Sequence, residues 1–230
     1  MPDLQVIEFD RNGPADTGLQ PWDPLPAEIL LSGNPLQTGH TYHEIDDGVF
    51  TAGVWDCTEH QLLASPYEVD EFMIVLEGSI IIEHDDGETR RFREGECFVI
   101  PRGTPCSWKQ DEYVRKFWAI HAPSTQLAGD PALHAILADP HVPLPPVAGL
   151  EASDFETGIP EMGLFSLYRD PTGSFEAGIW ECSPMRRVPG RLARSELMHI
   201  LEGNGAITNA DGVVFEFGPG DTFLVPLGMG

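Results

Sequence analysis

The chain has 230 residues, of which 37 are acidic and 13 basic, so its formal net charge is −24. Such a charge repels phosphate backbones and anionic membranes, which argues against a nucleic-acid partner or a membrane-surface protein. The sequence has no run of about 18 apolar residues and no leader-like N-terminus, and its four cysteines are too few for a disulfide framework. We therefore expect an acidic, cytoplasmic protein with reduced thiols.

Short strands dominate the predicted structure. Residues 71–76, 79–83, 97–100 and 114–120 are rich in β-branched and aromatic side chains, with a hydrophobic period of two. Turn signals such as Asp86-Gly87 separate these runs, and a glycine there accepts the positive φ of a tight hairpin turn. Many short strands at this spacing predict an antiparallel sandwich or barrel.

The chain also contains a long internal repeat. With an offset of 125 residues, positions 53–57 recur at 178–182 and positions 71–78 recur at 196–203, without an insertion or deletion. A repeat of this length is a folded domain rather than a solenoid unit, so the sequence predicts a tandem duplication.

The repeat sets the expected domain boundaries. We expect an N-terminal arm plus a first barrel over residues 1–121, and a second barrel over residues 151–230. Residues 122–150 are rich in Pro and Ala and form the expected linker, with one short helix over 132–138 capped by Asp130. The second copy lacks counterparts of Trp108, Lys116 and Trp118, so we expect its barrel to be incomplete or completed by other strands.

The glycines and prolines of each copy follow a spacing that resembles a known family. Glu71 is followed by Gly78, and then by Gly95 and a Pro101-x-Gly103 element. The second copy has the same spacing. The pattern resembles the two motifs of the cupin superfamily and, more narrowly, the ureidoglycine-aminohydrolase-like and ethanolamine-utilisation-like cupins. The resemblance implies an all-β bicupin of two tandem double-stranded β-helix barrels, of the jelly-roll, RmlC-like type.

The resemblance also implies the positions at which a metal would bind. Metal-dependent cupins place histidines at positions that are Ser65, Tyr67 and Cys106 in this sequence, and Gly190 and Leu192 in the second copy. None of the eight histidines has the motif spacing. The cofactor is therefore unknown, and we expect no protein-bound transition metal.

Strand alternation selects candidate ligand-binding residues in the first barrel. Glu71 and Met73 share one face, which by analogy with the superfamily faces the cavity, and Tyr67 has the same parity. A lone buried carboxylate is costly, so Glu71 should have a partner, and Lys116 or Arg115 on a later strand is expected to supply it. Equally consistent is a purely structural ion pair at Glu71.

Two more residues are expected at the mouth of the same cavity, Cys106 and Trp108. The alternative for the tryptophans Trp55, Trp108 and Trp118 is that they fill the barrel core, because aromatic side chains commonly fill small barrels.

The second copy carries the densest basic cluster of the chain, between Arg186 and Arg194. Arg194 shares its parity with Glu196, so both residues are candidates for an anion-binding site in the second cavity. A solvated loop is the alternative.

The function expected from these features is a bicupin that binds a small polar metabolite in its first barrel, with the catalytic residues unknown. One alternative is a metal-dependent, ureidoglycine-aminohydrolase-like enzyme of nitrogen metabolism, and another is a non-catalytic structural bicupin. A homodimer is a reasonable expectation because exposed strand edges in such barrels are commonly covered.

Overall fold

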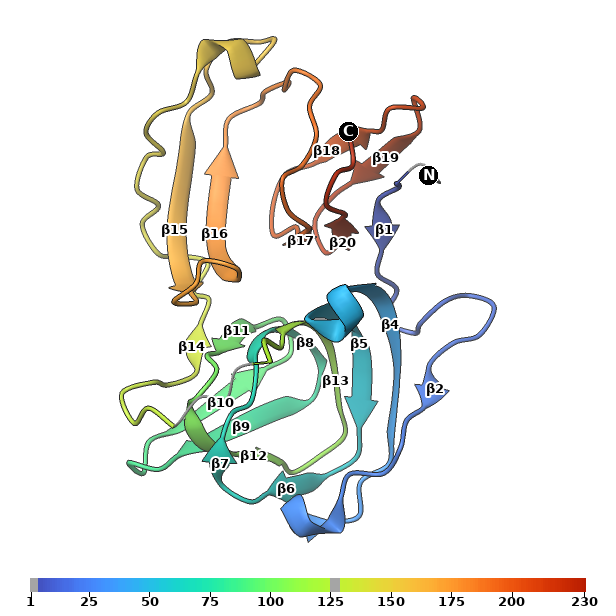
Figure 1. Cartoon of the computed structure of the whole chain (residues 1–230), viewed down its shortest axis with the longest axis vertical. Helices are drawn as coiled ribbons and strands as arrows, with labels where there is room; N and C mark the ends of the chain where they lie inside the picture. Colours follow the sequence, from blue (N-terminus) through green and yellow to red (C-terminus); the bar gives the residue numbers. More distant parts are fainter. Residues whose placement is uncertain (1–3, 125–128) are drawn as a thin grey trace. The chain divides into compact units, whose positions relative to one another are not determined.

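The computed structural model describes residues 4–124 and 129–230, and its regular structure is almost entirely β (Figure 1). The chain divides into two compact units. The barrel unit comprises Arg11–Pro145 and Leu164–Trp180, and the terminal unit comprises residues 4–10, Pro146–Gly163 and Glu181–Gly230. The helical segments of the described residues are short 3-10 turns, η1 (Ala27–Ile29), η2 (Asp46–Gly48) and η3 (Ala152–Asp154).

Two antiparallel sheets form the barrel unit, and Figure 1 shows them curving around a common interior. The seven-stranded sheet has the order β14 (Ile136–Leu137), β11 (Cys97–Ile100), β8 (Asp70–Glu77), β13 (Val114–His121), β5 (Phe50–Cys57), β4 (Gln37–Ile45) and β2 (Gln20–Pro21). The six-stranded sheet has the order β10 (Thr89–Arg93), β9 (Ser79–His84), β12 (Pro105–Gln110), β6 (His60–Leu62) and β3 (Leu30–Gly33), with β7 (Ser65–Pro66) paired to β12.

A motif glycine makes the tight connection from β8 to β9. Gly78 has φ +77°, and a Cβ added there would lie 2.2 Å from the carbonyl oxygen of Tyr113. Any other residue would therefore be strained by its backbone angle and would collide with the chain. Its counterpart in the second copy, Gly203, has φ +80°, so the repeated glycine adopts the same backbone region in both copies.

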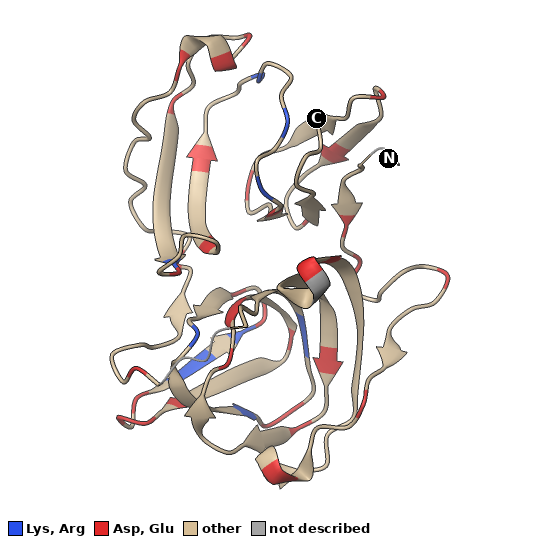
Figure 2. Ribbon diagram, in the orientation of Figure 1, with Lys and Arg blue, Asp and Glu red and all other residues tan. Residues whose placement is uncertain are grey.

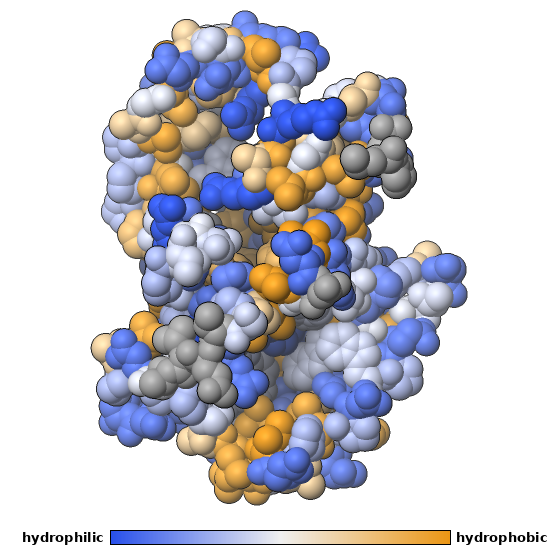
Figure 3. Space-filling view, in the orientation of Figure 1, coloured by the Kyte–Doolittle hydropathy of each residue, from blue (hydrophilic) through white to orange (hydrophobic). Residues whose placement is uncertain are grey.

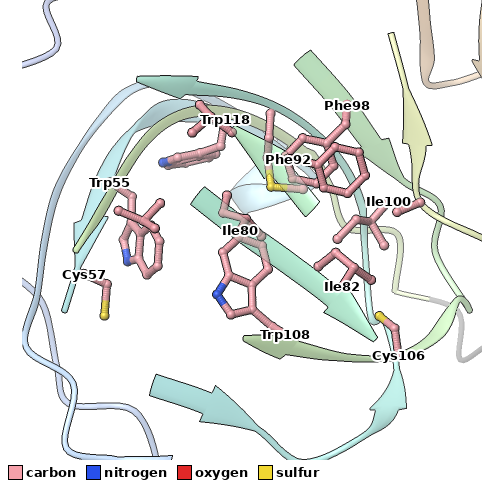
Figure 4. Close-up of a cluster of buried hydrophobic side chains, with 14 residues drawn as sticks. Trp55, Cys57, Ile80, Ile82, Phe92, Phe98, Ile100, Cys106, Trp108 and Trp118 are labelled. Carbon is pink, nitrogen blue, oxygen red and sulfur yellow. The ribbon is translucent and has the colours of Figure 1, made fainter. Parts of the chain in front are cut away.

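The core of the barrel unit lies between the two sheets. Phe92 and Phe98 stack with ring centroids 3.8 Å apart, and Ile80 and Ile82 on β9 are fully buried. Figure 4 shows these side chains converging from strands of both sheets. The alternating pattern of the sequence thus produces one apolar interior. The labelled members of this cluster are Trp55, Cys57, Ile80, Ile82, Phe92, Phe98, Ile100, Cys106, Trp108 and Trp118.

A hairpin from the start of the second repeat belongs largely to the barrel unit. Strands β15 (Met162–Arg169) and β16 (Glu176–Cys182) pair with each other. The Tyr168 hydroxyl donates a 2.6 Å hydrogen bond to Asp70, and the Phe175 ring stacks on His121 at 6.0 Å. These contacts explain why residues 164–180 join the barrel unit although the repeat places them in the second copy.

The terminal unit combines both ends of the described chain. Strand β20 (Thr222–Val225) pairs with β17 (Glu196–His199) on one side and with β1 (Ile7–Glu8) on the other. A separate hairpin consists of β18 (Gly205–Thr208) and β19 (Val214–Phe217). The sheet of the second copy is thus extended by a strand from the other end of the sequence, so the units are discontinuous, unlike the ranges expected from the repeat.

The short helix expected over residues 132–138 is absent, which corrects that prediction. Asp130 does cap a turn, since its Oδ1 accepts a hydrogen bond of 2.9 Å from the Ala132 amide. The chain then becomes extended as β14, which pairs with the edge strand β11. The edge hydrogen bonds and the burial of Ala135 in the core outweigh the local helix signal.

The four cysteines are free thiols. Acidic residues, red in Figure 2, are spread over strands and loops of both units, and basic residues are far fewer. No helix in the described part of the chain is long and apolar enough to cross a membrane.

Candidate functional site

A cavity of about 280 Å³ lies inside the barrel unit. Ligand pockets commonly measure about 300–1,000 Å³, so this one lies just below that range and has room only for a small molecule. Its walls come from both sheets and from the N-terminal segment before β3. The lining residues are Trp22, Leu25, Gln37, Trp55, His60, Leu62, Tyr67, Glu71, Trp108, Lys116, Trp118 and Ile120.

A buried ion pair forms the polar end of the cavity. Lys116 Nζ on β13 lies 2.7 Å from Oε1 of Glu71 on β8, and their side chains are 8% and 4% exposed. The same Nζ lies 3.2 Å from Sδ of Met73. An ammonium group has three protons, so these two contacts leave one donor of Lys116 for another acceptor.

Tyr67 completes this polar end. Its hydroxyl donates a hydrogen bond to Oε2 of Glu71, the carboxylate oxygen that Lys116 does not contact. Burial, together with the neighbouring Glu71 charge, raises the pKa of Tyr67 well above its usual value. Tyr67 is therefore a neutral hydrogen-bond donor at physiological pH, and both oxygens of Glu71 are occupied.

Tryptophan rings form the walls around the ammonium group. Lys116 Nζ lies 5.0 Å from the Trp55 ring centroid and 4.6 Å from that of Trp108, both within the range of cation–π attraction. Trp55 and Trp108 meet edge to face at 6.1 Å, as Trp22 and Trp118 do at 6.3 Å. Figure 4 shows Trp55, Trp108 and Trp118 directed into the same interior from different strands. The cavity therefore presents flat aromatic surfaces.

The indole N–H groups differ in whether they have a partner. Trp55 Nε1 donates to Oε1 of Gln37 at 2.8 Å, and Trp108 Nε1 donates to Oε1 of Gln110 at 3.0 Å. Trp118 Nε1 is buried and has no hydrogen-bond partner among the described residues. An unpaired buried N–H group destabilises the folded state, so a hydrogen-bond acceptor beside Trp118 would be stabilising.

Comparison with known proteins places this arrangement in a family. The EutQ-like cupin domain family matches residues 45–118 and 169–230, more than half of the chain. The chain belongs to the EutQ-like cupin family. This membership confirms the resemblance seen in the paired motifs of the sequence, and it agrees with the all-β jelly-roll fold.

Solved structures support the fold of this EutQ-like cupin. A protein of unknown function of the DUF861 family from Pseudomonas syringae pv. tomato has a TM-score of 0.76 at 21% identity, over 99% of this chain and 93% of that one. A putative glyoxylate-induced protein from Pseudomonas aeruginosa has a TM-score of 0.53 at 13% identity, over 99% and 88%. At these identities the likeness concerns the fold alone. No curated protein matches the sequence.

The motif positions of this EutQ-like cupin do not fit a metal. Both oxygens of Glu71 are bound by Lys116 and Tyr67, so an ammonium group already neutralises the carboxylate that a metal would use. Cys106 belongs to the packed apolar core, where burial raises its pKa to about 12. Ser65 is exposed on β7. The donor set expected from metal-dependent cupins is therefore replaced by an organic ion pair.

Most of the residues predicted for the cavity lie there. Tyr67, Glu71, Trp108 and Lys116 line it together. Met73 and Cys106 belong to the packed core beneath it, although Met73 still contacts Lys116. The tryptophans are both core and cavity wall, because their rings bridge the two regions.

The alternative partner for Glu71 has another role. Arg115 Nη2 lies 3.1 Å from Oδ2 of Asp56, on the opposite side of β13 from Lys116. Strand alternation explains why Lys116, and not Arg115, pairs with Glu71. Lys116 has the parity of Val114 and Trp118, whose side chains are buried in the core.

Some cavity residues had no signal in the sequence. Trp22 and Leu25 lie in an irregular proline-rich segment that has no counterpart in the repeat. His60 and Gln37 belong to strands whose pairing the periodicity does not reveal. Gln37 lies opposite Cys57 in the β4–β5 register, and its side chain reaches along the strand to accept the Trp55 indole proton.

The structure places Arg194 on the surface, which corrects the expectation that it enters a second cavity. Its side chain is 67% exposed, and its Nε lies 3.4 Å from Oε1 of Glu196, which is itself partly exposed. An exposed pair of this kind contributes little stability. The solvated-loop interpretation of the basic cluster is therefore favoured.

Proposed function

We propose that this EutQ-like cupin binds a small, flat metabolite in its first barrel, with a hydrogen-bond acceptor group at one end. The proposal rests on two buried N–H donors, one from Lys116 and one from Trp118, that lack acceptors. One proton of Lys116 has no acceptor in these contacts, and the Nε1–H of Trp118, another cavity-lining residue, has no hydrogen-bond partner among the described residues. A carboxylate or a cyclic amide supplies acceptors of this kind.

The aromatic walls support a planar ligand body. Trp55, Trp108 and Trp118 bring faces and edges to one small space, and such aromatic surfaces favour a flat ring over a bulky aliphatic body. The Lys116 charge favours an anionic or dipolar acceptor over a cation. The proposal concerns binding, and it assigns no catalytic step.

The structure of the polar end argues against the metal-dependent hydrolase alternative at this site. Lys116 occupies the place at Glu71 that a metal would need, so activation of a metal-bound water has no support from these residues. A structural role without a ligand remains the competing outcome of the test.

Thermal melts of the full chain with three matched probes test the proposal. Benzoate has a flat ring and a carboxylate, benzylamine has the ring and the opposite charge, and cyclohexanecarboxylate has the charge without the flat ring. We expect benzoate to raise the melting temperature most. Stabilisation by benzylamine alone would show that the assigned charge is wrong.

Variants connect such binding to the cavity. Trp118→Phe keeps an aromatic wall but removes the free N–H, so it should weaken benzoate binding. Trp180→Phe is the matched control, because Trp180 is 48% exposed and lies outside the cavity. Equal binding by all three proteins would refute the role of Trp118, and no binding by any probe would favour the structural alternative.

A further inference from the structure

A second cluster of ligating side chains lies at one end of the barrel unit, away from the cavity. The hairpin between β9 and β10 carries Asp86 and Glu88, and the segment before β14 carries His134. His134 Nε2 lies 2.9 Å from Oδ2 of Asp86 and 3.6 Å from Oε2 of Glu88. One potential donor atom from each residue lies within 4.8 Å of the others.

These separations suit a small divalent ion. Zinc bonds of about 2.0–2.1 Å to nitrogen and oxygen put neighbouring donors of a tetrahedral site about 3.3–3.4 Å apart. The two distances from His134 bracket that value. Arg90 contacts Oε1 of Glu88 at 2.5 Å, so its guanidinium faces the oxygen that the cluster does not use.

His84 provides an independent sign of a missing ligand at this cluster. It ends β9, its ring is buried, and both ring nitrogens have no hydrogen-bond partner among the described residues. Its ring centroid lies 4.5 Å from that of His134. A buried imidazole without any partner is costly, and a group held at the neighbouring cluster would give it one.

We propose that Asp86, Glu88 and His134 bind a divalent transition metal such as Zn²⁺, beside the buried ring of His84. One imidazole and two carboxylates form a mixed nitrogen and oxygen set that suits Zn²⁺ better than Ca²⁺ or Mg²⁺, which prefer oxygen alone. The ion would tie the segment around His134 to the β9–β10 hairpin. This site is separate from the cavity and independent of the function proposed for it.

Calorimetric titration of the chelator-treated full chain with Zn²⁺ tests the site. We expect one equivalent to bind, with Ca²⁺ much weaker, and Co²⁺ to give the visible absorption of a tetrahedral site. His134→Ala should lose at least about 100-fold in Zn²⁺ affinity, more than the roughly 10–100-fold typical of a lost outer-shell partner. The matched control is His141→Ala, an exposed histidine seven residues further along the same segment.

Further variants separate this site from other metal sites. Asp86→Asn, checked for folding by its melt in chelator, should weaken Zn²⁺ binding and reduce the Co²⁺ absorption. Unchanged affinity in that variant would contradict the three-donor site. Cys106→Ser should leave the Zn²⁺ affinity unchanged. If Cys106→Ser lowered the affinity and His134→Ala did not, the metal would bind at the cupin motif position instead. Equal affinity for Ca²⁺ would overturn the proposal in favour of a generic acidic loop.

Discussion

Lys116 forms its ion pair with Glu71 although the register of the two strands sets it opposite Val75. Its side chain runs along the inner face of β8, passes Sδ of Met73 and reaches the carboxylate of Glu71. The long lysine side chain thus joins positions that strand pairing leaves four residues apart. The pair is nearly inaccessible to solvent, so its two charges depend on each other.

Replacing one member of this pair should destabilise the protein strongly. Glu71→Gln leaves the Lys116 ammonium buried without its counter-charge, and we expect a loss of about 3–5 kcal/mol in unfolding free energy. The double variant Glu71→Gln/Lys116→Met removes both charges and should lose less than Glu71→Gln alone. Urea unfolding compares the parent protein with both variants, and a double variant less stable than Glu71→Gln would contradict the coupling.

The hydrogen bond from Tyr168 to Asp70 should hold the β15–β16 hairpin on the barrel unit. Tyr168→Phe removes a donor to a buried carboxylate, which typically costs about 1.5–3 kcal/mol. Hydrogen exchange should become faster in residues 164–180. The matched control, Tyr113→Phe, removes a donor to Asp56 in another part of the barrel, so it should leave exchange in the hairpin unchanged.

Stability should decrease in mild acid partly because of His60. Burial, the largest cause, lowers the pKa of His60, and the Lys116 charge lowers it further, against the opposing hydrogen bond to the Thr58 carbonyl. The folded state therefore holds His60 neutral. Its contribution is present above the unfolded pKa of about 6.5 and is lost as pH falls towards the lower folded value, at up to about 1.4 kcal/mol per pH unit.

Urea unfolding at several pH values tests this role of His60. His60→Gln should show a smaller loss of stability between neutral pH and mild acid than the parent protein. The same replacement at the exposed His141 is the control. A pH profile of His60→Gln that matches the parent would exclude a contribution from His60.

The homodimer stays a prediction, and the structure offers a place to test it. Ile29, Leu31 and Leu63 are exposed, and the Leu63 amide donates a 2.8 Å hydrogen bond to the Ile29 carbonyl. Figure 3 shows apolar surface at the end of the barrel unit where η1 and β6 lie. Light scattering at micromolar concentration should give a dimer mass, which Leu31→Glu should reduce and Leu137→Glu should not. A monomeric parent protein would end this prediction.

Much of the barrel could be predicted from the sequence because its signals are local. The period of two selects which side of each strand is buried, so Glu71 and Trp108 could be assigned to one interior before any pairing was known. The repeated glycines have the backbone angles that their tight turns require, as Gly78 and Gly203 show. Because a buried carboxylate needs a cation, Lys116 or Arg115 could be named as the partner of Glu71, and the structure selects Lys116.

By itself, the sequence determined the cupin fold, its duplication and the inward-facing set of the first barrel, because these follow from spacing and alternation along one chain. Only the tertiary structure decided which residues from distant segments complete the cavity, the sheets and the side-chain clusters. Trp22 enters the cavity, β1 pairs with β20, and His134 approaches Asp86 through contacts that no local pattern encodes. The physical reason is that edge pairing and the burial of side chains depend on the surfaces available after the strands assemble, and these overrode local preferences such as the helix signal after Asp130.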